Sequence, residues 1–308
     1  MNYIRHNTKF NIQNTAIALG KFDGLHKGHQ LLLRAILDQK KNGLAATVFT
    51  FDISPVKITT GNYDGMLMTS EEREQFLDAF GIDIVIEYPF THAFSQMEPE
   101  DFVHDILIGQ LGMRYLTVGE DFHFGRNQSG DVSLLTKLAP RYGFTLQIFH
   151  KLAQGTDVIG STGIKQLVRK GNMEQAFRWM GHPYAISGKV ISGDQLGRKL
   201  SFPTANLALP ADKVLPPYGV YAVKMTVEGK DYAGIANLGV KPTVKEHAAV
   251  GLETFLFDFD GDLYQKRIHV ALLHFIRPER RFDSIEALTS QIAEDVRYAR
   301  QLNEKELL

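Results

Sequence analysis

The chain has 308 residues and contains no cysteine. That absence excludes disulfide bonds, a thiol nucleophile and a cysteine-bound zinc site, and it suits a reducing compartment. The chain also lacks any run near the roughly 18 apolar residues that span a bilayer. Its first residues, MNYIRHNTKFNIQ, lack the apolar core of a signal peptide. We therefore expect a cytoplasmic protein with no membrane partner.

An excess of charge of either sign is missing as well. Lys and Arg number 34 against 35 Asp and Glu, which leaves a formal net charge of -1. No global positive field draws such a chain to nucleic acid, so a small molecule is the expected partner. The apolar share of 44% and the charged share of 22% are those of an ordinary globular protein. The length predicts two domains.

The first half alternates between apolar runs and helix-like segments. Between residues 15 and 149 the runs TAIAL, AATVFTF, DIVIEY, YLTVG and FTLQIF are separated by segments such as HQLLLRAILDQKKNG and PEDFVHDILIGQL. This alternation is typical of βαβ units. It predicts an α/β fold built on a parallel sheet.

The sequence pattern changes near residue 183, where the second half begins. β-rich runs such as GKVISG, YGVYAVKMTVEG and KRIHVALLHFI follow one another with few helices between them, which predicts an antiparallel barrel or sandwich. Glu228-Gly229-Lys230 and Asp260-Gly261-Asp262 are typical of hairpin turns. The tail FDSIEALTSQIAEDVRYARQL has apolar residues at helical spacing and predicts a closing helix. The expected domains are residues 1–183 and 184–308.

The stretch ALGKFDGLHKGHQLLL sets His26 and His29 around Gly28, after a strand and at the start of a helix. The turn from Gly20 to Gly24 then lies at the carboxyl edge of the sheet, where ligands bind. The free N–H groups of a helix N-terminus attract phosphate there. Two imidazoles three residues apart can face the same side and donate to phosphate oxygens that gain charge. A turn followed by two exposed histidines is the structural alternative.

The second half carries its own candidate chemistry. In FPTANL, Thr204 and Asn206 share a face if the strand continues, and their oxygens suit Mg²⁺ and its phosphates. In LETFLFDF, a period of two places Glu253 on the face of three aromatic residues, Phe255, Phe257 and Phe259. A carboxylate in that company is a candidate proton acceptor. The alternatives are a turn closed by Thr and Asn, and an edge-strand acid with its head in water.

GKFDGLHKGH resembles the HxGH signature of nucleotidylyltransferases, in the extended GxFDGxHxGH form of the prokaryotic bifunctional riboflavin kinase/FMN adenylyltransferase (FAD synthetase) family. The segments TVGEDFHFGRNQSGD, STGIKQLVRKGNMEQAFRWMGHPY, LGRKLSFPTANL, YGVYAV, ANLGVKPTV and LETFLFDFDGDLY follow in that family's order. The resemblance implies an N-terminal Rossmann-like nucleotidylyltransferase domain. It also implies a C-terminal antiparallel β-barrel riboflavin kinase domain with a closing helix.

The resemblance implies two consecutive reactions. Riboflavin is phosphorylated to FMN by ATP with Mg²⁺, and Glu253 takes the proton of the 5′-hydroxyl. FMN is then adenylated to FAD with release of pyrophosphate, while His26 and His29 stabilise the α-phosphate of ATP. The expected partners are therefore riboflavin, FMN, FAD and ATP, and any homo-oligomer is expected to be weak.

The remaining site residues divide by ligand. Those expected to bind ATP or its phosphates are Gly20, Phe22, Asp23, Gly24, Gly28, Ser161, Thr162, Lys165, Gly193, Arg198, Thr204 and Asn206, of which Thr204 and Asn206 also bind the metal. The residues expected to contact the flavin are Asp121, Phe124 and Arg277.

The chain departs from the family pattern mainly in its first half. Where the family has ISSTxIR, residues 159–165 read IGSTGIK, so Gly160 replaces a serine and Lys165 an arginine. Lysine keeps the charge but lacks the planar fork that grips phosphate twice. TFDISPVK lacks the histidine of the family's TFxPHP, with Ser54 or its neighbour in that place. We expect a weakened adenylyltransferase beside an intact kinase. The alternatives are a monofunctional riboflavin kinase with a degenerate N-terminal domain, and a non-enzymatic flavin-binding regulator.

Overall fold

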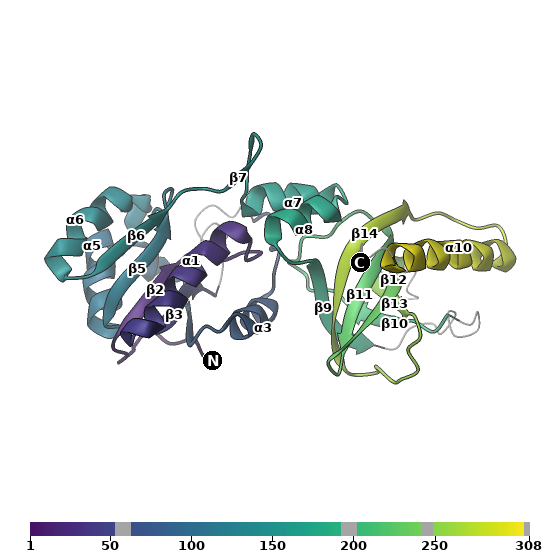
Figure 1. Ribbon diagram of the computed structural model, residues 1–308, viewed down its shortest axis with the longest axis horizontal. Coiled ribbons are helices and arrows are strands. Elements are labelled where there is room, and N and C mark those ends of the chain that lie inside the picture. The colour runs from purple at the N-terminus through teal and green to yellow at the C-terminus, as the bar shows by residue number, and fades with distance from the viewer. Residues whose placement is uncertain (53–62, 192–201, 242–248, 305–308) are drawn as a thin grey trace. The chain divides into compact units, whose positions relative to one another are not determined.

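The computed structural model describes residues 1–52, 63–191, 202–241 and 249–304. The chain divides into two compact units, Met1–Ser161 and Thr162–Leu308 (Figure 1). The boundary that the sequence places at residue 183 stays a prediction, and two helices lie between the two positions. In the described part of the chain, no helix is long and apolar enough to cross a membrane.

The first unit is built on a six-stranded sheet whose strands are all parallel. In chain order the strands are β1 (Asn2–Arg5), β2 (Thr15–Leu19), β3 (Ala45–Phe51), β4 (Ile84–Tyr88), β5 (Met113–Gly119) and β6 (Thr145–Phe149). Their order across the sheet is β1-β4-β3-β2-β5-β6. The predicted α/β architecture is confirmed. The five predicted strands are β2 to β6, whereas the edge strand β1 was not expected.

Helices cover both faces of this sheet. The longer helices are α1 (Lys27–Asp38), α3 (Ser70–Phe80), η2 (Phe102–Gln110) and α6 (Val132–Tyr142), and the shorter ones are η1 (Gln39–Asn42), α4 (His92–Ser95), α5 (Pro99–Asp101) and η3 (Arg126–Gln128). Two short strands, β7 (Ala153–Gln154) and β8 (Asp157–Val158), pair antiparallel in a separate sheet. Alternate residues of β2 feed the two resulting cores, because side chains of a strand alternate between faces. Ile17 packs in the core with η2 and α6, and Ala16 and Ala18 pack in the core with α1 and α3.

The strand order places a topological switch point at β2. The chain runs from β2 to β3 and β4 on one side, and later to β5 and β6 on the other. Ligands of open α/β sheets bind beyond the carboxyl ends of the strands at such a point. The turn after β2 and the N-terminus of α1 therefore lie where this fold binds ligands.

The second unit is a closed antiparallel barrel with helices before and after it. Its elements are α7 (Ser161–Arg169), α8 (Met173–Met180), β9 (Tyr184–Ile191), β10 (Ala205–Ala208), β11 (Gly219–Val227), β12 (Lys230–Lys241), β13 (Ala249–Leu256), β14 (Arg267–Pro278) and α10 (Ile285–Glu304). The strands close in the order β10-β13-β12-β11-β14-β9. Helix α10 packs through Ile292, Val296 and Ala299 on the cluster that contains Val220 and Ile235. The predicted barrel and closing helix are confirmed.

One of the two predicted hairpins is correct. Glu228 and Gly229 have φ of +52° and +82° and join β11 to β12, which pair antiparallel. The hairpin predicted at Asp260-Gly261-Asp262 is wrong, because β13 pairs with β10 and β12 while β14 pairs with β11 and β9. An Asp-Gly pair signals a turn locally but does not determine which strands pair across it.

Candidate active sites in the two units

The turn after β2 is held by its own buried aromatic residue. Phe22 is fully buried, with φ of +49°, although the sequence led us to expect it among the ATP-binding residues. A Cβ at Gly20 would lie 3.3 Å from the Phe22 ring, and that ring lies 5.1 Å from the His29 ring, centroid to centroid. Phe22 thus packs under the turn and beside one of the signature histidines.

Asp23 and Gly24 fasten the turn to the segment that leads into α3. The Asp23 Oδ1 accepts hydrogen bonds from the backbone N–H groups of Leu67 at 2.7 Å and Met68 at 3.3 Å. Gly24 has φ of +79°, and a Cβ there would lie 2.7 Å from the Leu67 Cδ1. The structure therefore gives both residues a direct role in shaping the turn, and their contact with ATP stays a prediction.

Neither His26 nor His29 is exposed, so the alternative of a turn followed by two exposed histidines does not hold. His26 is buried and is the N-cap of α1, where its Nδ1 accepts from the backbone N–H of His29 at 3.3 Å. An accepting Nδ1 carries no proton, so this hydrogen bond assigns the ring proton of His26 to Nε2, which can act as a donor. A Cβ at Gly28 would lie 3.1 Å from the His26 ring. Gly28 thereby leaves room for the ring to fold back over the helix end.

His29 stacks on His26 and is partly buried. The ring centroids are 3.7 Å apart and the planes lie 20° from parallel. Burial first, and the neighbouring His26 second, hold the pKa of His29 well below its usual value, so it is neutral at pH 7. Its buried Nδ1 has no hydrogen-bond partner among the described residues. Because an unpaired buried polar atom costs free energy, this nitrogen is suited to a ligand.

The stretch IGSTGIK (residues 159–165), the second signature of the chain, is hydrogen-bonded to the turn after β2. The Ser161 hydroxyl donates to the Asp23 carbonyl oxygen at 2.8 Å, across 138 positions of sequence. Thr162 and Lys165 follow on α7, with Thr162 exposed and Lys165 half-buried. A Cβ at Gly160 meets nothing within 4 Å, so packing does not demand the glycine found where the family has serine. Ser54 lies outside the described residues.

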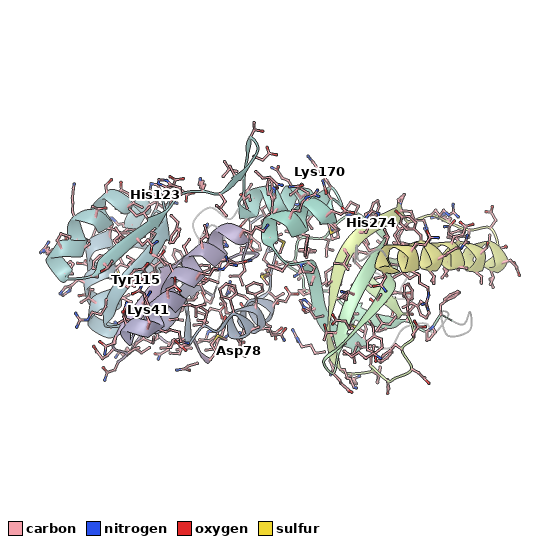
Figure 2. All side chains as sticks on the ribbon, in the orientation of Figure 1. Lys41, Asp78, Tyr115, His123, Lys170 and His274 are labelled. Carbon is pink, nitrogen blue, oxygen red and sulfur yellow. The ribbon has the colours of Figure 1, made fainter. Side chains whose placement is uncertain are left out.

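The loop after β5 carries two predicted flavin contacts. Asp121 is exposed, and its Oδ2 lies 2.8 Å from the Lys151 Nζ, a contact that raises the pKa of the lysine. His123, labelled in Figure 2, approaches the Asp121 carbonyl oxygen at 2.9 Å. Phe124 is buried and stacks on Phe122 at 5.6 Å. The loop thus presents Asp121 to solvent and anchors itself through Phe124.

In the barrel, strand register brings three polar residues into one row. Glu253 of β13 is paired with Asn206 of β10 on one side and Asn237 of β12 on the other. Paired residues project to the same face, and Phe255 lies on that face one step along β13. The row gives two amides and a carboxylate on three adjacent strands. Asn237 was not among the predicted site residues, although the quoted segment ANLGVKPTV contains it.

Two expectations about this region need adjustment. Strand β13 ends at Leu256, so the period of two does not extend to Phe257 and Phe259. The Phe257 ring still lies 6.0 Å from that of Phe255, but Phe259 packs on Tyr232 instead. Thr204 lies one residue before β10, which begins at Ala205.

Arg277 is engaged with the closing helix. Its guanidinium donates to the buried carboxylate of Asp295 on α10, with the Nε at 2.9 and 3.0 Å from the two oxygens and the Nη2 at 2.7 Å from the Oδ2. The pair gives Arg277 a structural role, and its contact with flavin stays a prediction. Gly193 and Arg198 lie outside the described residues.

Among the described residues, no group of three or more His, Asp and Glu side chains is arranged to bind a metal ion. The oxygens of Thr204 and Asn206, together with nucleotide phosphates, stay the predicted ligands of a divalent cation in the barrel. These are hard oxygen donors of the kind Mg²⁺ accepts, so the residues present fit such an ion.

Comparison with known proteins assigns a family to each half of the chain. A family model for FAD synthetase matches residues 8–163, and one for riboflavin kinase matches residues 180–303. A bifunctional riboflavin kinase/FMN adenylyltransferase of Escherichia coli (strain K12) is 37% identical over 292 residues, covering 94% of this chain and 93% of that protein. The chain belongs to the bifunctional riboflavin kinase/FMN adenylyltransferase family. Another bearing that name, from Haemophilus influenzae, is 33% identical over 298 residues, or 96% of each chain.

A solved structure also resembles this chain over nearly its full length. It is that of a protein from Streptococcus pneumoniae named as a macrolide-efflux protein, with a TM-score of 0.83, 28% identity and coverage of 95% of each chain. The name, with the efflux that it mentions, belongs to the Streptococcus pneumoniae protein. The likeness shows that the two proteins share their fold over nearly the full length of both chains.

Proposed function

We propose that each unit of this chain performs one ATP-dependent step of FAD biosynthesis. The second unit phosphorylates riboflavin to FMN, and the first adenylates FMN to FAD. The observation that carries the residue assignment is the stacked pair of neutral histidines at the N-terminus of α1, at the switch point of the sheet. A site of this kind donates to phosphate without adding a buried charge.

In the adenylylation step, an FMN phosphate oxygen forms a bond to the α-phosphorus of ATP, and the bond to the oxygen that bridges to the β-phosphate breaks. Pyrophosphate leaves with that oxygen. The attacking oxygen is already anionic, so no base is needed. His26 donates from its Nε2 to an oxygen on the α-phosphorus, and the free N–H groups of α1 and its dipole favour the developing negative charge.

In the kinase step, the riboflavin 5′-hydroxyl attacks the γ-phosphorus and ADP leaves. Glu253 accepts the hydroxyl proton, and its neighbour Asn206 together with Thr204 binds a divalent cation and the phosphates. When bound, that cation neutralises charge on the phosphate oxygens. We propose Mg²⁺, because a hydroxyl and an amide oxygen combined with phosphates form a set of ligands that this ion uses.

Gly160 and Lys165 weaken the adenylylation site relative to the family pattern. Lysine gives phosphate a single charged head in place of a bidentate fork. The hydroxyl of Ser161 donates to the Asp23 carbonyl oxygen. This hydrogen bond joins residues 159–165 to the turn after β2. We therefore propose that FAD formation is the slower of the two steps.

Two variants test the assignment within one chain. Glu253→Gln should abolish FMN formation from riboflavin and leave FAD formation from supplied FMN intact. His26→Ala should do the reverse. Each variant's retained activity shows that the unchanged unit works, and its melting temperature shows whether the changed unit is folded. The assignment fails if either variant loses both activities while keeping its wild-type melting temperature, or loses neither.

A further inference from the structure

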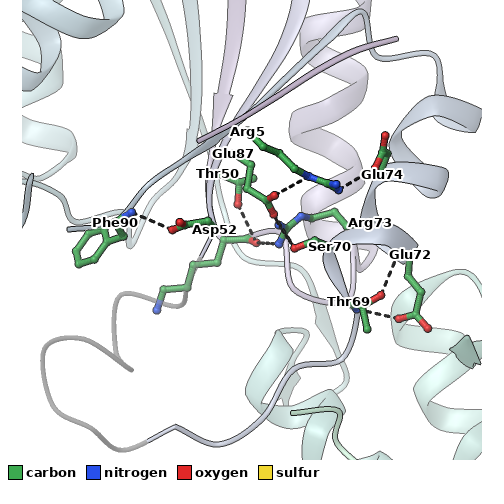
Figure 3. A network of polar contacts seen from close by, with 11 residues as sticks. Arg5, Thr50, Asp52, Thr69, Ser70, Glu72, Arg73, Glu74, Glu87 and Phe90 are labelled. Carbon is green, nitrogen blue, oxygen red and sulfur yellow. Dashed lines mark hydrogen bonds and ion pairs between the residues drawn. The ribbon is translucent and has the colours of Figure 1, made fainter. Parts of the chain in front are cut away.

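Three neighbouring strands of the first unit end in side chains that lie side by side. Thr50 of β3 is paired with Glu87 of β4, and Glu87 is paired with Arg5 of β1. All three belong to the carboxyl edge of the sheet, which is the edge that carries the turn from Gly20 to Gly24. Figure 3 shows them converging with Ser70 and Arg73 from the first turns of α3.

Glu87 is the buried centre of this group. Its side chain is 4% exposed, and that of Arg73 is 9% exposed. The Glu87 Oε1 accepts from the Arg73 guanidinium and, at 2.7 Å, from the Ser70 hydroxyl. The Oε2 accepts from the Arg5 Nε at 3.0 Å. Burying these charges has a desolvation cost that can exceed their attraction, so stability alone is a weak explanation for the pair.

The group also reaches the turn after β2. The Thr50 Oγ1 donates to the carbonyl oxygen of Lys21 at 3.3 Å, and the Arg73 Nη1 approaches the same oxygen at 3.5 Å. Lys21 stands between Gly20 and Phe22. Two donors, one from β3 and one from α3, therefore converge on a single carbonyl within the turn.

That carbonyl belongs to the peptide group leading into Phe22, whose ring packs beside His29. Holding the Lys21 carbonyl fixes this peptide plane, the buried Phe22 ring and, through it, the stacked histidines. A shift of about 1 Å in such groups can lower a rate by about 100-fold. The contacts thus join a buried ion pair at the sheet edge to the residues placed at the reacting phosphate.

We propose that Thr50 and Arg73 are positioning residues for FMN adenylylation, which hold the Lys21 carbonyl so that His26 and His29 meet the α-phosphate of ATP. Glu87 in turn fixes the Arg73 guanidinium. The inference rests on the proposed function of the first unit. It adds a requirement to that function, since neither residue was among the predicted site residues, although Thr50 is the first residue of the quoted stretch TFDISPVK.

Thr50→Val tests the proposal with little change in shape. The variant keeps the ion pair and loses the hydroxyl that donates to Lys21. Thr47→Val is the matched control, because Thr47 is a fully buried threonine of the same strand whose hydroxyl donates to Ala45. We expect Thr50→Val to lower kcat for FMN adenylylation about tenfold, with KM for ATP little changed. Equal kcat values for the two variants would overturn the proposal.

Arg73→Lys separates positioning from simple charge pairing. A lysine can pair with Glu87 through its single ammonium group but cannot also reach the Lys21 carbonyl, as the arginine fork does. We expect a melting temperature near that of the wild type with a reduced kcat. If Arg73→Lys retains full adenylylation, the ion pair is structural only and the proposal is wrong.

Two further readouts keep this test separate from the proposed function. Riboflavin kinase activity resides in the other unit, so its rate in each variant corrects for the amount of enzyme, and the melting temperature of the first unit shows whether that unit is folded. His26→Ala tests the adenylylation site itself. If His26→Ala leaves FAD formation unchanged, the proposed function of the first unit fails. If His26→Ala abolishes it while Thr50→Val and Arg73→Lys do not reduce it, only the positioning inference fails.

Discussion

The pair between Arg277 and Asp295 offers a prediction that separates two roles for one arginine. The sequence suggests a flavin contact for Arg277, whereas the structure shows it tied to the closing helix α10. The Asp295 side chain is 3% exposed and that of Arg277 is 18% exposed. The Asp295 Oδ1 also accepts from the Gln291 Nε2 at 3.0 Å. The perturbations are Arg277→Met and Asp295→Asn, each of which removes one member of the pair.

The expected magnitude follows from burial and geometry. Removing one partner of a buried, hydrogen-bonded ion pair costs about 3–5 kcal/mol, because the other charge stays buried. For a unit of this size each kcal/mol lowers the melting temperature by about 2–4 °C. We therefore expect both variants to melt at least about 6 °C below the wild type. Replacing both residues with apolar ones should recover part of that loss.

The assay combines thermal unfolding with riboflavin kinase kinetics below the melting temperature. If the pair is structural, KM for riboflavin stays near its wild-type value in both single variants. Our reasoning is refuted if Arg277→Met raises KM for riboflavin severalfold without lowering the melting temperature. That result would place Arg277 at the flavin.

Three other predictions concern the residues assigned to the adenylylation step. His29 has a pKa well below its usual value, so the unfolded chain binds its proton first as the pH falls. The stability that the neutral His29 contributes is complete above about pH 6.5 and is lost as the pH falls below it. In urea unfolding between pH 7.5 and 5.5, the wild type should therefore lose about 1.4 kcal/mol more of its free energy of unfolding than His29→Gln does. Gly28→Ala places a Cβ 3.1 Å from the His26 ring and should displace the N-cap, costing about 1 kcal/mol in thermal unfolding and slowing FAD but not FMN formation. Gly160→Ser with Lys165→Arg should raise kcat/KM for adenylylation about tenfold, since Gly160 has open space for a Cβ and one more charge-assisted hydrogen bond is worth roughly 1.5 kcal/mol. An unchanged kcat/KM in that double variant would show that these two departures do not limit the reaction.

The fold was predictable where strands are buried along their whole length and therefore appear in the sequence as apolar runs. Strands β2 to β5 are buried or nearly so along their length, so their apolar runs stand out from the polar helix surfaces between them. Strand β1 has only four residues and is half exposed, and its pairing with β4 is visible only in three dimensions. The hairpin wrongly predicted at Asp260-Gly261-Asp262 failed for the same reason. Local turn signals do not determine which strands become neighbours.

The site was predictable where the chemistry sits in one short motif. His26, Gly28 and His29 meet through helix spacing alone, and the structure adds the stacking, the cap and the neutral state. Thr50 and Arg73 were missed because they lie on β3 and α3, and no short spacing joins them to Lys21. Asn237 was missed because its relation to Glu253 depends on the pairing of β12 with β13.

The central claim is that one chain converts riboflavin to FAD in two separately located steps. The most direct measurement follows riboflavin, FMN and FAD over time with purified protein, riboflavin and excess ATP and Mg²⁺. We predict that FMN accumulates first and FAD follows more slowly, with FAD lost in His26→Ala and both products lost in Glu253→Gln. FMN that never becomes FAD, even when supplied in excess, would contradict the account of the first unit, and the absence of both products would contradict it for the whole chain.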